Sequence, residues 1–298
     1  MIKKKNSKNQ VRYYIKDSIA FKSLKNRIST KNKSKKNFYV GGLRLKGLFK
    51  KGFKNNPLIS IVMPNFKSKN LSKSIISVLR QNYPNVELIV IDGNSGNLNL
   101  KILKKFNDQI DYWISENDKG MWDAWNKGFK LSRGNFVGIV DSSNILYPDA
   151  CKILSKYVNK YKNIDFVCGT VRKDGTIYTG YRPQDIYKQF NIKPSSIVGF
   201  YIKLKSLKKA GLLNIKYKIQ ADYDLLYRLI VKKKFKGIST KGNEIFGDLG
   251  KSGFSKKHSF FKTLFNELKI RFNNGQNIFI LMYIFLGRST KKFINFNN

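Results

Sequence analysis

A chain of 298 residues, 41% hydrophobic and 14% aromatic, has the apolar content of one large or two modest folded domains, which excludes an intrinsically disordered protein. Lys and Arg number 59 against 18 Asp and Glu, so the formal net charge of +41 indicates either attraction to polyanions or a compositional bias toward Lys. A single histidine, and two cysteines without metal-ligand spacing, exclude a Cys/His zinc site and leave acid–base chemistry to carboxylates.

Residues 1–56 are rich in Lys, Asn and Ser and contain one acid, Asp17. Their apolar residues have partly helical spacing, so we expect a basic N-terminal extension that is partly helical or disordered. No signal peptide is visible, because no apolar stretch of useful length follows the basic first nine residues. Together with the cysteine usage, this predicts a cytoplasmic protein.

A regular alternation of apolar strands and amphipathic helices begins at residue 57. The predicted strands are 58–63, 86–91, 110–115 and 136–140, and the predicted helices are 71–80, 98–106, 121–131 and 148–161. Continuous apolar strands that alternate with helices are typical of a parallel sheet covered on both faces. We therefore predict an α/β fold with a mostly parallel central sheet flanked by helices.

Polar residues, including several of the few acids in the chain, follow the strands of this predicted sheet. Pro64 and Asn65, Asp92, the stretch 116–120 and Asp141 come after the four strands in turn. Because ligands of such sheets bind beyond the carboxyl ends of the strands, these residues converge on one ligand-binding edge. A G-x-G-x-x-G loop and a Walker A loop are both absent from the sequence, so an ordinary Rossmann dehydrogenase or P-loop enzyme is excluded.

The alternation loosens after residue 169. We predict a hairpin over 170–181, helices over 222–233 and 260–272, and a short strand over 235–240. The apolar run 278–286 is about half the ~20 residues that a membrane-spanning helix requires. It predicts either a buried terminal helix or a helix that lies in the plane of a membrane surface.

Six stretches carry a family resemblance, in this order along the chain: ISIVMPNF, SVLRQNYPNVELIVIDGNS, WISENDKGMWDAWNKG, GNFVGIVDSSN, KAGLLN and QADYDLLYRL. The region 57–253 resembles family 2 glycosyltransferases with the GT-A fold, and is most similar to bacterial enzymes that build capsule, lipopolysaccharide or exopolysaccharide. The resemblance implies a GT-A (Rossmann-like) domain over 57–254, with a nucleotide-sugar-binding half at 57–154 and an acceptor half at 155–254. Helices over 255–298, membrane-associated in one interpretation, would follow it.

The implied activity is inverting transfer of a sugar from a nucleotide-diphosphate sugar, most often a UDP-sugar, to a glycan or lipid-linked acceptor. Asp92 would accept a hydrogen bond from the base, and Pro64 and Asn65 would line the same pocket. A turn-forming Asp-Gly pair is the alternative for Asp92, and a simple strand stop is the alternative for Pro64 and Asn65.

The stretch 118–128 would contact the rest of the donor. Lys119 and Gly120 let the backbone turn close to the ligand, and Asp123 and Asn126 can point the same way from the helix that follows. The alternative for Asp123 is a surface pair with Lys127. Trp122, Trp125 and Phe129 share helical spacing and are expected in the core.

The end of the fourth strand departs from the family pattern. Related proteins usually carry further acids there, whereas Ser143 and Asn144 occupy those positions in this sequence. Asp141 remains, and with the Asn144 carbonyl it could hold Mg²⁺ or Mn²⁺, hard cations that often use one or two carboxylates plus substrate phosphates. The departure leaves open a catalytically degenerate protein that binds a nucleotide sugar or glycan.

Asp222 matches the catalytic base of the family, which takes the proton of the acceptor hydroxyl. A helix N-cap is its alternative role. We expect Asp224 to be structural, and Asp248 with the stretch 251–253 to form a mobile loop near the diphosphate. The basic surface and the apolar C-terminus favour work at the inner face of the plasma membrane. Nucleic acid is a less favoured partner, because no base-reading module is recognisable.

Overall fold

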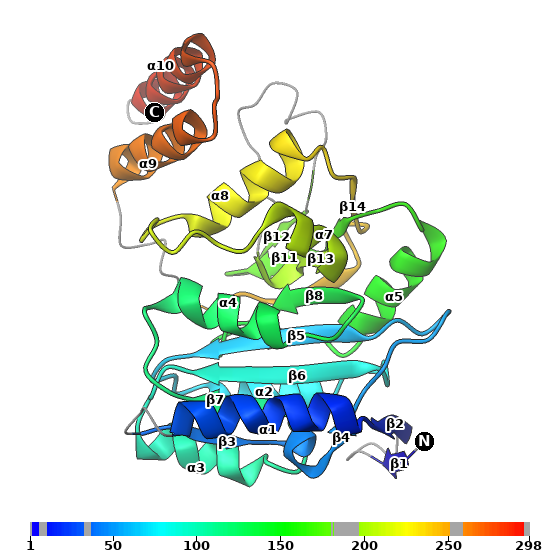
Figure 1. Ribbon diagram of the computed structural model, residues 1–298. Coiled ribbons are helices and arrows are strands. Elements are labelled where there is room, and N and C mark those ends of the chain that lie inside the picture. The colour runs from blue at the N-terminus through cyan, green and yellow to red at the C-terminus, as the bar shows by residue number, and fades with distance from the viewer. Residues whose placement is uncertain are drawn as a thin grey trace.

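The computed structural model describes residues 2–5, 11–32, 37–179, 181, 197–250 and 259–294. Its centre is an eight-stranded sheet in the order β14-β10-β13-β8-β5-β6-β7-β3. These strands are Gly237–Ser239, Phe166–Cys168, Phe200–Lys203, Phe136–Ile139, Ile59–Asn65, Val86–Asp92, Tyr112–Ser115 and Tyr39–Gly41. β8, β5, β6 and β7 run parallel, while β13 and β3 are antiparallel to their neighbours. The predicted α/β class with a mostly parallel central sheet is confirmed (Figure 1).

Helices cover both faces of this sheet, because alternate residues of the strands point to opposite sides. On one face α2 (Leu71–Leu79), α3 (Asn97–Lys105) and α5 (Ala150–Lys160) pack against a cluster that includes Ile59, Ile61 and Met63 of β5. On the other face α4 (Met121–Leu131), α7 (Leu204–Ala210) and α8 (Ala221–Tyr227) share a second cluster with Val62. The two clusters are the hydrophobic core of the domain.

α4 lies unusually close to the sheet at Gly128. A side-chain carbon added at this glycine would come within 2.1 Å of Cγ1 of Val62, so only a residue without a side chain fits. The close approach buries Trp122, Trp125 and Phe129 against the sheet, as predicted. This helix is thereby fixed relative to the strand ends that precede it.

Two smaller sheets flank the centre. One contains β12 (Thr176–Tyr178), β11 (Thr170–Lys173), β15 (Ile245–Asp248) and β9 (Ile145–Leu146), in that order. The predicted hairpin is present as β11 and β12, with Asp174 and Gly175 at positive φ in its turn. The other contains β1 (Ile2–Lys5), β2 (Val11–Lys16) and β4 (Leu48–Phe49).

The described residues among the first 56 are joined closely to the domain. The expected helix is present as α1 (Ser18–Asn32), but β3 forms the edge of the central sheet by pairing with β7. After β3 comes the short 3₁₀ helix η1 (Leu43–Lys46). The side chains of Arg44 in η1 and of Lys50 beyond it are buried. The boundary expected at residue 57 is therefore crossed by strand pairing and by buried ion pairs.

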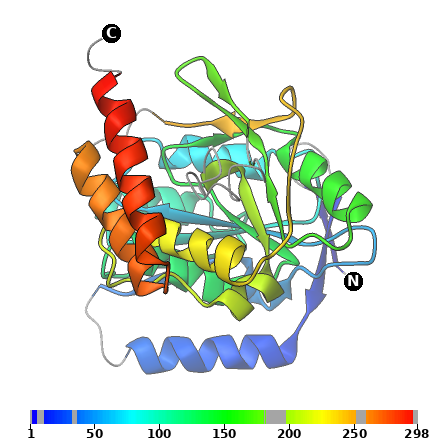
Figure 2. The ribbon, with the colours of Figure 1, turned by 90° about the horizontal axis from the view of Figure 1, so that it is seen from above.

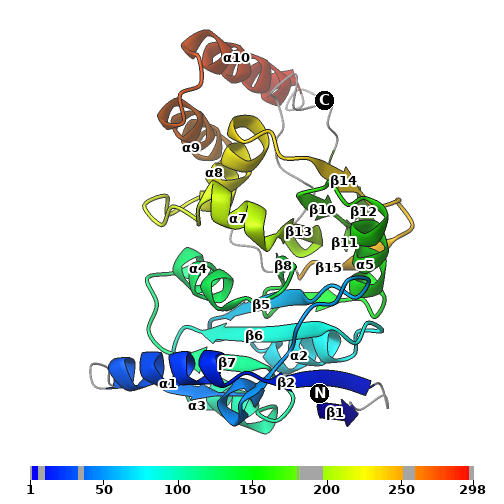
Figure 3. The same cartoon turned by 45° about the vertical axis from the view of Figure 1, so that its right-hand side comes forward.

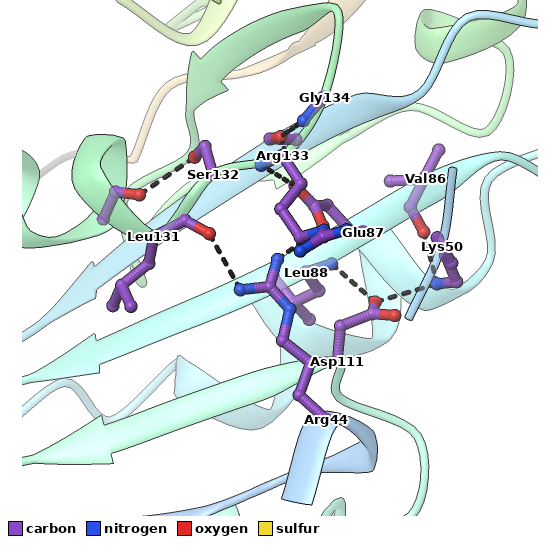
Figure 4. A network of polar contacts seen from close by, with 12 residues as sticks. Arg44, Lys50, Val86, Glu87, Leu88, Asp111, Leu131, Ser132, Arg133 and Gly134 are labelled. Carbon is purple, nitrogen blue, oxygen red and sulfur yellow. Dashed lines mark hydrogen bonds and ion pairs between the residues drawn. The ribbon is translucent and has the colours of Figure 1, made fainter. Parts of the chain in front are cut away.

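Those buried ion pairs lie at the amino ends of the strands (Figure 4). Arg44 Nη2 lies 2.5 Å from Glu87 Oε2, and Lys50 Nζ lies 2.8 Å from Asp111 Oδ2. Glu87 also accepts hydrogen bonds from Ser60 Oγ and from the amide of Arg133. Although burial opposes it, the charge of Arg44 together with these hydrogen bonds holds the pKa of Glu87 below its usual value. The network ties η1 to β5, to β6 and to the loop that leads into β8.

At the other end of the chain, α9 (Phe260–Asn273) and α10 (Ile278–Ile294) form a helical hairpin that packs on α8. Seen from above, the two helices lie side by side (Figure 2). Within the described ranges, no helix is both long enough and apolar enough to cross a membrane. The alternative of a buried terminal helix for 278–286 is wrong, because most of its large side chains are exposed and only Leu281 and Ile284 are buried.

Candidate functional site

Three parallel strands end side by side at polar residues. In the strand register Asn65 of β5 pairs with Asp92 of β6, and Asp92 pairs with Ser115 of β7. The arrowheads of β5 and β6 point to the same edge of the sheet (Figure 1). The sequence-predicted convergence of polar residues on one edge is therefore confirmed for Asn65 and Asp92, and Ser115 joins them.

Asp92 is fully buried at this edge, and its carboxylate is surrounded by hydrogen-bond donors. Asn65 Nδ2 lies 2.6 Å from Oδ1, Ser115 Oγ lies 2.6 Å from Oδ2, and the amide of Ser95 lies 3.1 Å from Oδ2. These contacts hold the ends of β5, β6 and β7 together. The predicted contacts of Asp92 and Asn65 with a nucleotide base stay predictions. Pro64 is buried just before them, and its carbonyl accepts a hydrogen bond from the amide of Ser142.

A second carboxylate, Asp118, lies over the first residue after β6. A side-chain carbon added at Gly93 would come within 2.7 Å of Asp118 Oδ2 and within 3.2 Å of the Phe66 ring. Oδ1 of Asp118 accepts a hydrogen bond from the amide of Gly120 at 2.9 Å, whereas Oδ2 has no hydrogen-bond partner among the described residues. Burial raises the pKa of this half-buried carboxyl group. Asp118 thus presents an open oxygen beside an exposed aromatic ring.

α4 begins immediately after this carboxylate. Gly120 has a φ of 103°, a backbone conformation that favours glycine, and the amide of Lys119 donates to Asp123 Oδ2 at 3.0 Å. Lys127 Nζ lies 3.3 Å from Asp123 Oδ2 and 3.0 Å from Oε1 of the buried Glu116. The alternative of an Asp123–Lys127 pair is therefore present. Contacts of Lys119, Gly120 and Asp123 with a donor stay predictions.

Asn126 is buried on α4 and forms hydrogen bonds with the loop that leads to α8. Its Nδ2 donates to the carbonyl of Leu213 at 2.9 Å, and its Oδ1 accepts from the amide of Leu213 at 3.0 Å. Trp122 Nε1 donates to the carbonyl of Lys218 in the same loop. The side-chain amide of Asn126 is thus engaged inside the protein, and its predicted ligand contact would compete with these bonds.

The end of β8 and the start of α8 bring two further acids together. Oδ1 of Asp141 is enclosed and has no hydrogen-bond partner among the described residues. Burial, and then the nearby charge of Asp222, raise the pKa of Asp141 to about 7. Asp222 itself is half-buried in the first turn of α8. Its alternative role as the N-cap is excluded, because Gln220 occupies that position.

Asn144 closes the turn that follows Asp141. Its backbone amide donates to the carbonyl of Asp141, and its side-chain Oδ1 accepts from the amide of Gly250 at 2.8 Å. Oδ1 of Asp141 is thus left without a partner among the described residues, while the oxygen predicted from Asn144 is already engaged, and the predicted metal site stays a prediction. Across the described ranges, no group of three Asp, Glu, His or Cys side chains could hold a metal. The predicted loop 251–253 and the single histidine lie outside the described residues.

Two other acids are engaged in structural contacts. Asp224 pairs with Arg228 at 2.9 Å and accepts from Asn274 Nδ2 at 2.9 Å, as expected for a structural residue. Asp248 accepts hydrogen bonds from Arg172 Nε and Nη2. These hydrogen bonds hold the pKa of Asp248 below its usual value, although burial alone would raise it. Its predicted place in a loop near the diphosphate stays a prediction.

The sequence placed Asp118 at the ligand edge only as part of the stretch 116–120, without a role of its own, and it did not indicate Phe66 as a site residue. The signal was present in Asp92-Gly93, because a glycine directly after a strand-end acid permits another group to approach the backbone. Which group approaches depends on the path of the loop after β7, which residue spacing does not determine. The remaining acids, Asp92, Asp123, Asp141 and Asp222, were all named from the sequence.

Known proteins resemble this chain over the same region. The family model described as "Glycosyl transferase family 2" matches residues 60–227. An uncharacterised glycosyltransferase of Rickettsia typhi is 29% identical over 189 residues, which are 59% of this chain and 59% of the relative. WfgD of Escherichia coli, named UDP-Glc:alpha-D-GlcNAc-diphosphoundecaprenol beta-1,3-glucosyltransferase, is 34% identical over 114 residues, which are 38% of this chain and 45% of that protein. The match thus spans about three fifths of the Rickettsia relative and less than half of WfgD.

Solved structures support the fold. Staphylococcus aureus TarS 1–349 in complex with UDP-GlcNAc superposes with a TM-score of 0.60 at 15% identity, covering 76% of this chain and 70% of TarS 1–349. The mannosyltransferase PcManGT of Pyrobaculum calidifontis, in complex with GDP-Man and Mn²⁺, superposes with a TM-score of 0.50 at 14% identity, over 84% of this chain and 69% of PcManGT. These likenesses confirm the GT-A fold expected from the sequence. With the family model spanning more than half of its length, this chain belongs to glycosyl transferase family 2.

Proposed function

We propose that this protein is an inverting glycosyltransferase of cell-surface polysaccharide synthesis. It would move a sugar from a nucleotide-diphosphate sugar to a glycan or lipid-linked acceptor at the inner face of the plasma membrane. The observation that carries the proposal is the meeting of Asp141 and Asp222, which come from distant elements to one end of the sheet. The names of WfgD and of the TarS complex favour a UDP-sugar as donor, and the name of WfgD favours a diphosphoundecaprenol-linked acceptor.

Asp222 is the proposed catalytic base. Its half-buried carboxylate has no hydrogen bond or ion pair among the described residues, so it is open to an acceptor hydroxyl. As the hydroxyl oxygen attacks the anomeric carbon, its proton passes to Asp222. The bond from that carbon to the diphosphate breaks on the opposite face, and the diphosphate leaves with the electron pair. Inversion at the anomeric carbon follows from this in-line geometry.

Donor binding is assigned to the other acids of the edge. Asp141 would hold a divalent cation through its enclosed oxygen, and such a cation neutralises charge on the departing diphosphate. To the predicted donor residues we add Asp118, whose open Oδ2 can accept a hydrogen bond from an N–H group of the base. Asp92 then has a positioning role, because its three internal bonds set the strand ends on which the pocket is built.

The second candidate is a degenerate member that binds a nucleotide sugar or glycan without transfer. One observation favours it. Asp141 is the one carboxylate in the turn 141–144, and the side-chain oxygen of Asn144 is already engaged by the amide of Gly250. Such a protein would bind UDP without Mn²⁺ and would release no UDP from any sugar donor.

Two variants separate binding from chemistry. Asp222→Asn should leave the affinity for UDP within about twofold and lower UDP release from UDP-glucose or UDP-GlcNAc by about a hundredfold or more. Asp118→Asn should instead weaken UDP binding by about tenfold, the value of one hydrogen bond to a charged group. Calorimetry with UDP, with and without Mn²⁺, and a UDP-release assay with a diphosphoundecaprenol-linked GlcNAc acceptor measure the two effects.

Asp108→Asn is the matched control, because Asp108 is an exposed acid that pairs with Lys46 on the surface. It should change neither UDP binding nor UDP release. Retained turnover in Asp222→Asn would show that this residue is not the base. Metal-independent binding without release in the unaltered protein would favour the degenerate alternative.

A further inference from the structure

The C-terminal hairpin, α9 with α10, exposes large apolar side chains to solvent. The exposed set on α9 includes Phe265 and Phe272, and the set on α10 includes Ile278, Phe279, Met282 and Leu286. Phe279 is 74% exposed, although a phenylalanine normally lies in a core. Single exposed apolar residues are ordinary on a protein surface, but a contiguous set on two neighbouring helices marks an interaction surface.

Other side chains of the hairpin are buried. They include Leu264 on α9 and Leu281 and Ile284 on α10, and the buried Ile270 packs with Tyr223 and Tyr227 of α8. On α10 the exposed residues recur at spacings of three and four positions, which places them on one face of the helix. The rings of Phe265 and Phe285 lie 5.8 Å apart, so the exposed face continues from one helix to the other. The hairpin thus has an inner face that packs on the protein and an outer apolar face.

The charges of the hairpin are positive. Residues 259–294 include six Lys or Arg and one acid, Glu267. Glu267 is buried and forms an ion pair with Arg288, whereas Lys262 and Lys269 are exposed. An apolar face bordered by exposed cations and free of exposed acids is complementary to a surface of anionic lipids. A second copy of the hairpin would instead bring cations against cations.

We propose that the outer face of the C-terminal hairpin docks on an anionic phospholipid surface and lies in its plane. Phe265, Phe279, Met282 and Leu286 would enter the boundary between headgroups and acyl chains, with Lys262 and Lys269 at the lipid phosphates. The hairpin lies at one end of the molecule, beyond α8, in two views (Figures 1 and 3). This position lets a planar surface approach it without meeting the central sheet.

The inner face fixes the hairpin to the helix that carries the proposed base. Arg271 Nε donates to Tyr223 Oη at 2.7 Å, and Asn274 Nδ2 donates to Asp224 Oδ1 at 2.9 Å. Ile270 packs with Tyr223 and Tyr227 in a separate small cluster. Docking of the hairpin would therefore set α8 at a fixed distance from the lipid surface.

Vesicle flotation with the full chain tests the proposal. The protein should float with vesicles that contain phosphatidylglycerol and phosphatidylcholine, and should bind vesicles of phosphatidylcholine alone more weakly. The double variant Phe279→Ser with Met282→Ser should bind the anionic vesicles about tenfold less tightly, because two apolar side chains are lost from the interface. Lys262→Gln with Lys269→Gln should also weaken binding and should reduce its dependence on salt.

Leu98→Ser is the matched control. Leu98 is 77% exposed on α3, so it tests whether loss of any exposed apolar side chain lowers binding. It should float like the unaltered protein, and all variants should keep their thermal midpoint because the altered residues lie on the surface. Equal flotation of the Phe279→Ser, Met282→Ser variant would overturn the proposal. So would a concentration-dependent dimer that this variant abolishes, since the occupant would then be a second copy. UDP binding is the independent readout, and it should be unchanged in every variant.

Discussion

At the scale of single residues, ionisation of the buried Asp141 lowers the stability of the folded protein, so its effect on stability depends on pH. An aspartate in an unfolded chain has a pKa of about 3.9, whereas burial and Asp222 raise that of Asp141 to about 7. Between these values the folded protein keeps a proton that the unfolded chain has lost. The contribution of Asp141 to the free energy of unfolding therefore falls as pH rises from about 4 to 7.

Asp141→Asn removes this cost. The variant should have the same stability as the unaltered protein near pH 4 and should exceed it by on the order of 2–4 kcal/mol at pH 8. Urea denaturation over this pH range, in a buffer with chelator, measures the difference. Mn²⁺ with UDP should then stabilise the unaltered protein and not the variant. A stability difference that does not change with pH would show that the pKa of Asp141 is not raised in the folded protein.

Asp92 is a residue whose position the sequence predicts but whose hydrogen bonds it does not. The strand-end position of Asp92 and its likeness to the family motif were sufficient to place it at the ligand edge. They could not show that three donors, from Asn65, Ser95 and Ser115, already surround its carboxylate. Ser95 lies three residues after Asp92, but Asn65 and Ser115 come from the ends of two neighbouring strands, and the register that aligns them with Asp92 is a property of the folded sheet.

At the scale of elements, η1 offers a matched pair of cations. Arg44 and Lys46 lie two residues apart, but the side chains of Arg44 and Glu87 are 4% and 1% exposed, whereas those of Lys46 and Asp108 are 51% and 70% exposed. Arg44→Met should lower the free energy of unfolding by about 3–5 kcal/mol, because it leaves the charge of Glu87 buried without its partner. Lys46→Met should change it by about 0–1 kcal/mol, as an exposed pair contributes little.

Urea denaturation of both variants measures these differences (Figure 4 shows the buried contact). Similar small effects would mean that the N-terminal segment is not an integral part of the fold.

The sequence did not predict this role for 37–56, because Glu87 lies in a continuous apolar run and nothing in the spacing connects it to Arg44. Periodicity did predict the strands and helices between 58 and 161, where each element buries its own regular face. Pairing between segments distant in sequence has no such local signal.

At the scale of the whole molecule, the apolar hairpin and the proposed base belong to one connected unit. α9 packs on α8, and the first turn of α8 carries Asp222, whose charge acts on Asp141. If the hairpin docks on lipid, the reaction site is held near acceptors whose lipid tails are in the same surface. The search for acceptor is then confined to two dimensions, while the nucleotide sugar still arrives from solution.

This arrangement predicts a selective effect of lipid on activity. Anionic vesicles should raise the rate of transfer to a diphosphoundecaprenol-linked acceptor in the vesicle by about tenfold, through the higher local concentration of acceptor. They should leave the affinity for UDP unchanged, because the proposed donor residues lie at the strand ends and not on the hairpin. The Phe279→Ser, Met282→Ser variant should lose the increase, and Leu98→Ser should keep it. An equal increase in both variants would show that lipid acts on the acceptor alone, and that the hairpin does not couple α8 to the surface.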